Sequence, residues 1–311
     1  MPELPDLEHL VVELNAQVIG STIAKARVRD PIVLRLALEG DLDSLVRGQQ
    51  LRAVRRRGAF LELEVGAELK LVLHLMLAGR LKVTPSTDRD EGPLCFALDL
   101  GGRELRYLDD KRMGKAYLIR RSDDALVPGL STLGVDILSP AFTREHFTKL
   151  VAKRRDQVRA FIMDQSAISA IGNAYADESL FEARLHPKTW CRQLTPPQVA
   201  ALHRAIGAVM RDAIQQVADR AAPMQEKVRD FLEVRGRAGE PCPRCGTKIR
   251  TVRVLDADAC FCPTCQPATR SLFIDWNRVP KPPEAAPIAP IDAPRPMLKR
   301  KKSTRTRSAK K

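Results

Sequence analysis

Hydrophobic and polar positions change their spacing twice along the chain. Soon after Pro5 the apolar residues recur every three or four positions, which predicts a helix near the start. From residue 22 to about 120 apolar and polar residues tend to alternate, as is typical of strands. The alternation is clearest over residues 60–65 and 69–74, and the pair Gly101-Gly102 suits a hairpin turn.

The spacing becomes helical again beyond Pro140. Apolar residues keep this spacing from Thr143 to about Val217, which predicts several helices. Turns are predicted at residues 186–187 and 195–197, where prolines interrupt the pattern. The chain therefore predicts a β-rich part followed by a helical part.

The end of the chain differs in composition. Residues 280–297 are rich in Pro and Ala, which predicts an extended linker. The tail from Lys299 to Lys311 is basic and offers little to bury, which predicts disorder. Of the net charge of +14 on 311 residues, +9 comes from residues 278–311. Charge thus favours a polyanionic partner, but the rest of the chain is only mildly basic and charge alone does not establish nucleic-acid binding.

The sequence carries no sign of export. Its first residues are acidic where a secretory signal is basic, and no apolar run reaches membrane-spanning length. We therefore expect a cytoplasmic protein, in the bacterial cytosol or nucleoid, with no membrane partner. Seven cysteines in a reducing compartment favour metal ligands or core residues over disulfides, and Cys95 and Cys191 are expected to be ordinary buried residues.

Four other cysteines form two C-x2-C pairs. Cys242 pairs with Cys245 and Cys262 pairs with Cys265, with 16 residues between the pairs. Two such turns can complete a tetrahedron around one structural Zn²⁺, which replaces a core that so short a segment cannot build. Cys260 is an alternative ligand, and four unrelated buried cysteines are the competing interpretation. The pattern predicts a metal without predicting a function.

The start of the chain offers a nucleophile. Pro2 follows the initiator Met, and small second residues usually permit removal of that Met. The exposed secondary amine would be partly neutral near pH 7, because terminal amines titrate at about 8. It could attack the anomeric carbon of a sugar and form an iminium, with Glu3 moving protons beside it. Chain ends are usually frayed, so the Met-Pro start alone does not establish that Pro2 is a nucleophile.

Three motifs together resemble one protein family. The opening PELPDLE of residues 2–8 is similar to the PELPEVE start of formamidopyrimidine-DNA glycosylases, which are relatives of endonuclease VIII. The segment SAIGNAYADE of residues 169–178 resembles the family's helix–two-turns–helix motif, and residues 236–266 match its zinc finger in spacing. These motifs occur in the family's order, which makes a chance match very improbable.

The resemblance implies an α+β multidomain fold. We expect an N-terminal β-sandwich flanked by helices, which is the catalytic domain, over residues 1–130, and a helical helix–two-turns–helix domain over residues 131–235. A four-cysteine zinc β-hairpin over residues 236–270 and a Pro-rich linker with a basic tail over residues 271–311 complete the expected organisation. The implied partner is double-stranded damaged DNA, and we expect a monomer.

The resemblance also implies roles for single residues. Pro2 would be the nucleophile and Glu3 the general acid. Asn173 would hold a DNA phosphate, in part through a helix N-terminus; an Asn in a left-handed turn is the alternative. Arg112 would contact a phosphate, unless it is a solvated surface charge. Glu178 would support the motif, although a solvated helix acid is equally consistent with the sequence.

A damaged nucleotide must leave the stack before its sugar can reach Pro2. The family fills the gap with three side chains, and the matching positions here are Leu77, Lys111 and Met113. Leu and Met can wedge apolar bulk into the stack; core packing or an ordinary loop is the alternative for both. His74 is expected to be a buried, hydrogen-bonded residue.

Two cations of the family pattern are missing. The strand lysine is Ala59, and the arginine of the finger is Ala257. Arg57 is the candidate to bind DNA in place of the lysine, with Arg253 as another. The stretch over residues 213–235 also lacks the family's GGTTLxDF element, which implies a shorter cap over an extruded base.

These features leave two main hypotheses. Retention of Pro2 and Glu3 favours a DNA glycosylase with AP lyase activity on oxidised or ring-opened bases and abasic sites. The losses at Ala59 and Ala257 favour a damaged-DNA binding protein of the same fold with little base excision. A zinc-ribbon transcription factor would leave the N-terminal motif unexplained.

Overall fold

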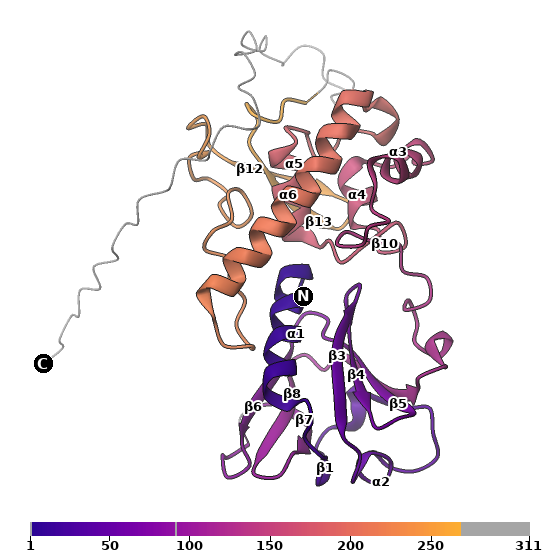
Figure 1. Ribbon diagram of the computed structural model, residues 1–311. Coiled ribbons are helices and arrows are strands. Elements are labelled where there is room, and N and C mark those ends of the chain that lie inside the picture. Colours follow the sequence, from indigo (N-terminus) through magenta and orange to yellow (C-terminus); the bar gives the residue numbers. More distant parts are fainter. Residues whose placement is uncertain (1, 91, 269–311) are drawn as a thin grey trace, which may run out of the picture. The chain divides into compact units, whose positions relative to one another are not determined.

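The computed structural model describes residues 2–90 and 92–268 (Figure 1). The linker and tail predicted within residues 271–311 lie outside the described residues. The α-helices are α1 Leu4–Val18, α2 Leu42–Val46, α3 Arg144–Ala152, α4 Val158–Met163, α5 Asn173–Glu182 and α6 Pro196–Arg220. The strands are β1 Lys25–Val28, β2 Leu34–Leu36, β3 Leu51–Arg57, β4 Phe60–Val65, β5 Leu69–His74, β6 Gly79–Pro85, β7 Leu94–Asp99, β8 Arg103–Asp109, β9 Lys115–Arg120, β10 Val135–Asp136, β11 Ile168–Ser169, β12 Arg250–Val254 and β13 Ala257–Phe261.

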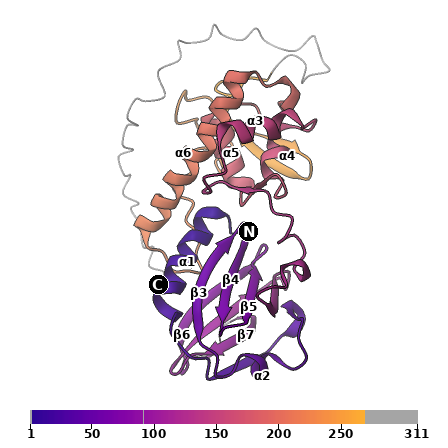
Figure 2. The same ribbon diagram turned by 45° about the vertical axis from the view of Figure 1, so that its right-hand side comes forward.

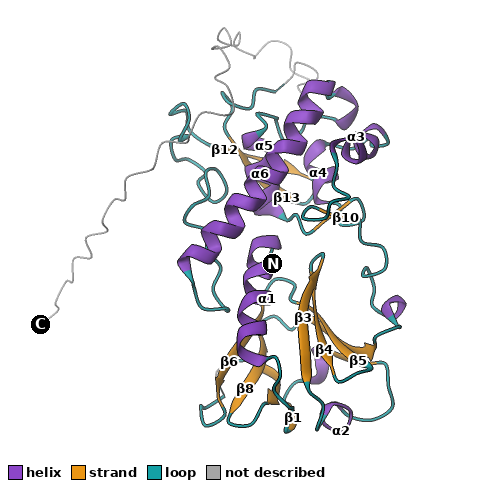
Figure 3. Ribbon diagram, in the orientation of Figure 1, coloured by secondary structure: helices purple, strands orange, loops and turns teal. Residues whose placement is uncertain are grey.

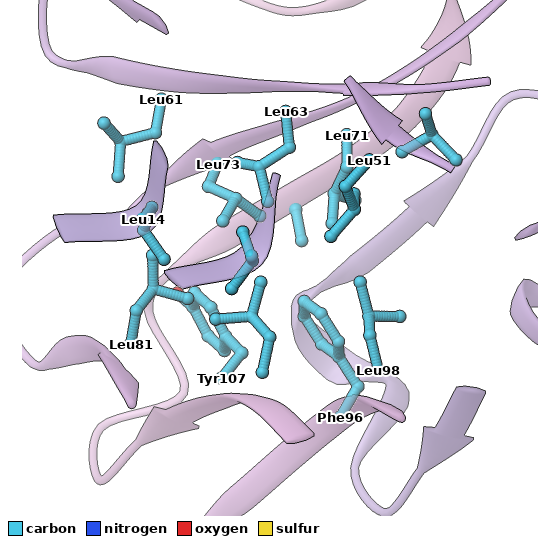
Figure 4. Close-up of a cluster of buried hydrophobic side chains, with 14 of the residues drawn as sticks. Leu14, Leu51, Leu61, Leu63, Leu71, Leu73, Leu81, Phe96, Leu98 and Tyr107 are labelled. Atoms are coloured by element: carbon cyan, nitrogen blue, oxygen red, sulfur yellow. The ribbon is translucent and has the colours of Figure 1, made fainter. Parts of the chain in front are cut away.

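The first nine strands form two sheets. The five-stranded sheet has the order β2-β9-β5-β4-β3, and the four-stranded sheet has the order β1-β7-β8-β6; β3, β4 and β5 run side by side in Figure 2. Alternate side chains of both sheets meet in one core (Figure 4). Within it Phe96 and Tyr107 stack with ring centroids 5.1 Å apart. The predicted alternation over β4 and β5 and the hairpin at Gly101-Gly102 are confirmed.

Helix α1 belongs to two cores at once. Glu3 is its N-cap and Pro5 lies in its first turn, so the helix begins at Leu4, slightly earlier than the sequence predicts. Leu7, Leu10 and Leu14 pack into the core between the sheets, whereas Leu4 is completely buried in the core of the helical part.

Helices α3 to α6 surround that second core, as the helical spacing predicts (Figure 3). Helix α6 continues to Arg220 and ends where Ala221 adopts a left-handed conformation. Short helix α2 was not predicted; Asp41 and Ser44 cap it reciprocally, a signal that is too local to appear as periodicity. Within residues 2–90 and 92–268 no helix is both long and apolar enough to cross a membrane.

Candidate active site and zinc centre

The backbone of Glu3 is held by its own helix. Its N–H donates to a carboxylate oxygen of Asp6 at 2.8 Å, so Asp6 and Glu3 form a capping box at the start of α1. Pro2 is buried beside it, and only 7% of Glu3 is exposed. The first residues are therefore fixed, and a frayed chain end is wrong for residues 2 and 3.

The side chain of Glu3 lies against the N-terminus of α5. Its carboxylate accepts the backbone N–H groups of Gly172 at 3.1 Å, Ala174 at 3.0 Å and Tyr175 at 3.2 Å. These are N–H groups that a helix leaves unsatisfied in its first turn, and the helix dipole favours an anion there. Burial nevertheless outweighs these bonds and raises the pKa of Glu3, which favours a proton on this carboxyl group.

Residue 172 must be a glycine, because the side chain of Glu3 packs directly against it. A Cβ atom on Gly172 would lie 2.5 Å from Cδ of Glu3. The Gly of the motif thus provides the space into which the acidic side chain fits.

An ion pair joins α1 to the segment before the zinc hairpin. Arg229 donates two hydrogen bonds to Asp6, at 2.8 and 2.6 Å. Its guanidinium carbon also lies 5.4 Å from the ring centroid of Tyr175. No pattern in the sequence singles out Arg229, because its partner Asp6 lies 223 positions away.

Asn173 is the first residue of α5, so the alternative of a left-handed turn at this residue is wrong. The left-handed residue is Ala170, three positions earlier, with φ +71°. The side-chain oxygen of Asn173 accepts a hydrogen bond from Arg159 at 2.8 Å. This bond aligns the Asn amide while leaving its N–H₂ group available to an acceptor.

Arg159 and Asp177 form a buried ion pair of 2.7 Å behind Asn173. The same Asp177 accepts the N–H of Cys260 at 2.9 Å and a bond from Arg235 at 2.9 Å. Strand β13 is therefore attached directly to α5.

Glu178 makes a second attachment. Its carboxylate accepts the N–H groups of Glu233, Val234 and Arg235 at 2.8–3.0 Å, and 6% of the residue is exposed. Burial raises its pKa to about 7 although these three bonds act in the opposite direction. The solvated acid considered from the sequence is wrong.

The metal-ligand prediction is supported by geometry. One ligand atom from each of Cys242, Cys245, Cys262 and Cys265 lies within 4.8 Å of the others. Sulfurs on a tetrahedral Zn²⁺ with bonds of about 2.3 Å would be roughly 3.8 Å apart, and two of the Sγ pairs here measure 3.9 and 3.4 Å. Cys260 is outside this cluster, so the alternative ligand is wrong; the four cysteines hold one structural zinc ion.

The candidate DNA contacts at residues 111–113 share one turn between β8 and β9. Both oxygens of buried Asp109 shape it, by accepting the N–H groups of Lys111 at 3.0 Å and Gly114 at 2.6 Å. Arg112 has a left-handed φ of +54°, and its exposed guanidinium is ion-paired with Asp30 at 2.6 Å. Lys111 and Met113 are exposed.

Leu77 lies between β5 and β6 and is 50% exposed, and Met113 is 39% exposed. Core packing is therefore wrong for both, and each remains free to contact a partner. His74 is half-buried, and its Nδ1 accepts the N–H of Met76 at 3.3 Å, as expected for a structural histidine.

The departures from the family pattern fall at two hairpin turns. Ala59 lies between β3 and β4 and is 8% exposed. Beside it Arg57 is already ion-paired with Asp124, so its charge is partly neutralised. Ala257 opens β13, and Arg253 on β12 is exposed without an ion pair to any residue that the structure describes.

A small pocket opens beside Pro2. Asp6 and His9 of α1 line it, together with Leu75 and the segment Met224–Lys227. Its volume of about 20 Å³ corresponds to roughly one water molecule. The pocket is therefore too small to hold a nucleobase as it stands.

Comparison with known proteins gives matches along most of the described chain. The formamidopyrimidine-DNA glycosylase N-terminal domain matches residues 1–116. The formamidopyrimidine-DNA glycosylase H2TH domain matches residues 133–222, and a zinc finger found in FPG and IleRS matches residues 239–268.

Curated relatives and solved structures agree with these matches. A formamidopyrimidine-DNA glycosylase of Symbiobacterium thermophilum is 34% identical over 286 residues, covering 89% of this chain and 93% of its own. One of Thermus thermophilus is 34% identical over 276 residues, covering 86% and 98%. A Lactococcus lactis Fpg mutant in complex with Fapy-dG containing DNA has a TM-score of 0.80 at 26% identity, and the wild-type enzyme with oxidised-pyrimidine DNA has 0.80 at 27%; each covers 86% of this chain and 100% of that chain.

Proposed function

Because this chain belongs to the formamidopyrimidine-DNA glycosylase family, we propose that it excises oxidised or ring-opened bases from double-stranded DNA and cleaves the strand as an AP lyase. The observation that carries the proposal is the buried Glu3 carboxyl group, held at the N-terminus of α5 next to buried Pro2. We assign catalysis to residues 1–130, DNA binding to residues 131–235 and the zinc hairpin to residues 236–270. The protein would act as a monomer in the bacterial cytosol.

The reaction begins at the amine of Pro2, once Met1 is removed. Its lone pair attacks C1′ of the damaged nucleotide, and the N–C1′ bond forms as the bond from C1′ to the base breaks. The base leaves with that electron pair and gains the proton that the amine loses. Protonated Glu3 donates to O4′ as the sugar ring opens, which leaves an iminium between Pro2 and C1′. Loss of a C2′ proton then expels the 3′ phosphate.

DNA contacts follow from exposed and half-buried residues of the described chain. Asn173 would donate to a phosphate, and Arg112 and Arg57 would do so by exchanging their carboxylate partners for phosphate oxygens. Leu77, Lys111 and Met113 would occupy the space of the extruded nucleotide. The zinc ion holds the β12–β13 hairpin, and its four thiolates leave no open coordination position for catalysis.

Borohydride trapping on a duplex with an abasic site tests the proposal. The protein without Met1 should form a covalent adduct, and Pro2→Gly or retention of Met1 should greatly reduce it. Ala59 and Ala257 favour a second candidate, a damaged-DNA binding protein. Tight binding of the abasic duplex without any adduct would establish that candidate instead.

A further inference from the structure

Lys227 lies on a segment that is clamped against the start of α1. Before Lys227 in the chain, the carbonyl oxygen of Ala222 forms a hydrogen bond with His9 Nε2 at 2.9 Å. After it, Arg229 forms an ion pair with Asp6. Between these bonds Met224 packs on the core between the sheets. The backbone of this segment is thus fixed at three points beside the helix that Glu3 caps.

The side chain of Lys227 has little to hold it. Its Nζ donates to the Leu77 carbonyl at 3.4 Å, a long bond, and the residue is exposed. No carboxylate of residues 2–90 or 92–268 lies within ion-pair distance of it, and Asp6 in the same pocket is paired with Arg229. The ammonium group therefore keeps donors for an external acceptor.

This cation lines the pocket that Pro2 also lines. Because both residues line this small pocket, a nucleotide whose sugar reaches Pro2 would lie within reach of the Lys227 side chain. We propose that Lys227 is a substrate-binding residue that donates to an acceptor oxygen of the damaged nucleotide, either a phosphate oxygen or a base carbonyl. The inference rests on the proposed function. Lys227 would also supply a cation to a site in which Ala59 stands at the position of the family's lysine.

The test compares three variants in otherwise intact protein: Lys227→Ala, Lys227→Arg and Lys25→Ala. Lys25 is an exposed lysine of β1, outside the residues proposed to contact DNA or the reacting sugar, so its removal matches the loss of net charge. Each protein is assayed on an abasic-site duplex and on a duplex with a ring-opened purine, at one salt concentration.

Lys227→Ala should lower kcat/KM roughly ten-fold or more, as expected for the loss of a hydrogen bond to a charged group. Lys227→Arg should retain most activity, and Lys25→Ala should resemble the wild type. A loss on both duplexes identifies a phosphate acceptor, and a loss on the base-bearing duplex alone identifies a base carbonyl. Equal behaviour of Lys227→Ala and Lys25→Ala on both duplexes overturns the inference.

Failure of the proposed function is a separate result. A wild-type protein that forms no adduct would lack the lyase activity. Affinities of the same variants for a tetrahydrofuran-containing duplex would then decide whether Lys227 binds the lesion.

Discussion

The carboxylate of Glu3 accepts the N–H of Gly172 at 3.1 Å, across 169 positions of sequence. The same carboxylate accepts the N–H groups of Ala174 and Tyr175, and so supplies the N-cap interaction that a glycine has no side chain to make. The proposed acid and the start of α5 consequently depend on each other.

Gly172→Ala tests this dependence. A Cβ at 2.5 Å from Glu3 Cδ must displace the carboxylate, so we expect a loss of about 1–3 kcal/mol of unfolding free energy and slower base release. Gly207→Ala in α6 is the control, because its Cβ meets only the flexible Arg211 guanidinium at 3.2 Å and alanine favours the helix. Urea unfolding and single-turnover assays measure both effects. Equal stability and activity of the two variants would show that the position of Glu3 does not depend on Gly172.

The pH dependence of base release should have two limbs. The rate should rise as the Pro2 amine loses its proton and fall as Glu3 loses its own. Burial raises the pKa of Glu3, so at any given pH a larger fraction of the protein should hold this acid protonated than an exposed glutamate would allow. The residual activity of Glu3→Gln should lack that limb, because an amide does not titrate. A falling limb at an unchanged pH in this variant would assign it to another group.

Removal of one zinc ligand should release the metal. Cys245→Ser is expected to lose the single zinc and weaken DNA binding, because the β12–β13 hairpin has only a small core of its own. Cys260→Ser is the matched control and should keep one zinc, since its sulfur is outside the cluster. Elemental analysis and binding to an abasic duplex measure the outcome. Zinc retained at full occupancy in Cys245→Ser would refute the ligand set.

The ion pair between Asp6 and Arg229 should contribute more to stability than a surface pair. Asp6 is 6% exposed, so Arg229→Met would leave a buried carboxylate without its partner, at an expected loss of about 2–4 kcal/mol. A double-mutant cycle with Asp6→Asn isolates the coupling. The exposed pair of Arg237 and Glu240 should give about 0–1 kcal/mol in the same cycle. Equal coupling energies in the two cycles would contradict the expected role of burial.

Substrate preference should follow the missing cation at Ala59. We expect weak excision of 8-oxoguanine opposite cytosine and better activity on ring-opened purines, oxidised pyrimidines and abasic sites, because poorly stacked lesions are easier to extrude. Single-turnover assays on the four substrates compare them directly, and Ala59→Lys should restore part of the purine activity. Robust 8-oxoguanine excision by the unmodified protein would show that another cation has replaced the lysine.

Sequence patterns predicted those features of the fold that are determined by residues close together in the chain. The alternation in β4 and β5, the helical spacing of α1 and the paired cysteines all depend on residues close together in the chain, and the structure has each of them. The family motif identified residues 169–178 as a unit for the same reason.

The contacts that assemble the site could not be predicted in this way. In the sequence Glu178 cannot be told apart from a solvated acid on a helix surface. Its burial depends on hydrogen bonds from residues 233–235, which are distant in the sequence. Arg57 is half-buried in β3, and its partner Asp124 lies 67 positions further along the chain. Arg229 and Lys227 lie in a stretch without a motif, and their partners Asp6 and the Leu77 carbonyl are far away in the sequence.

The position of Leu4 in the helical core, apart from the rest of α1, has a consequence for synthesis on the ribosome. Residues 2–6 are translated about 170 residues before their partners in α5. At roughly 5–20 residues per second this is a delay on the order of ten to thirty seconds. During that interval the growing chain can form the two sheets, but the surroundings of Pro2 are not yet complete. The amine that we propose as the nucleophile would thus be made long before the surroundings that we propose for its reaction are in place.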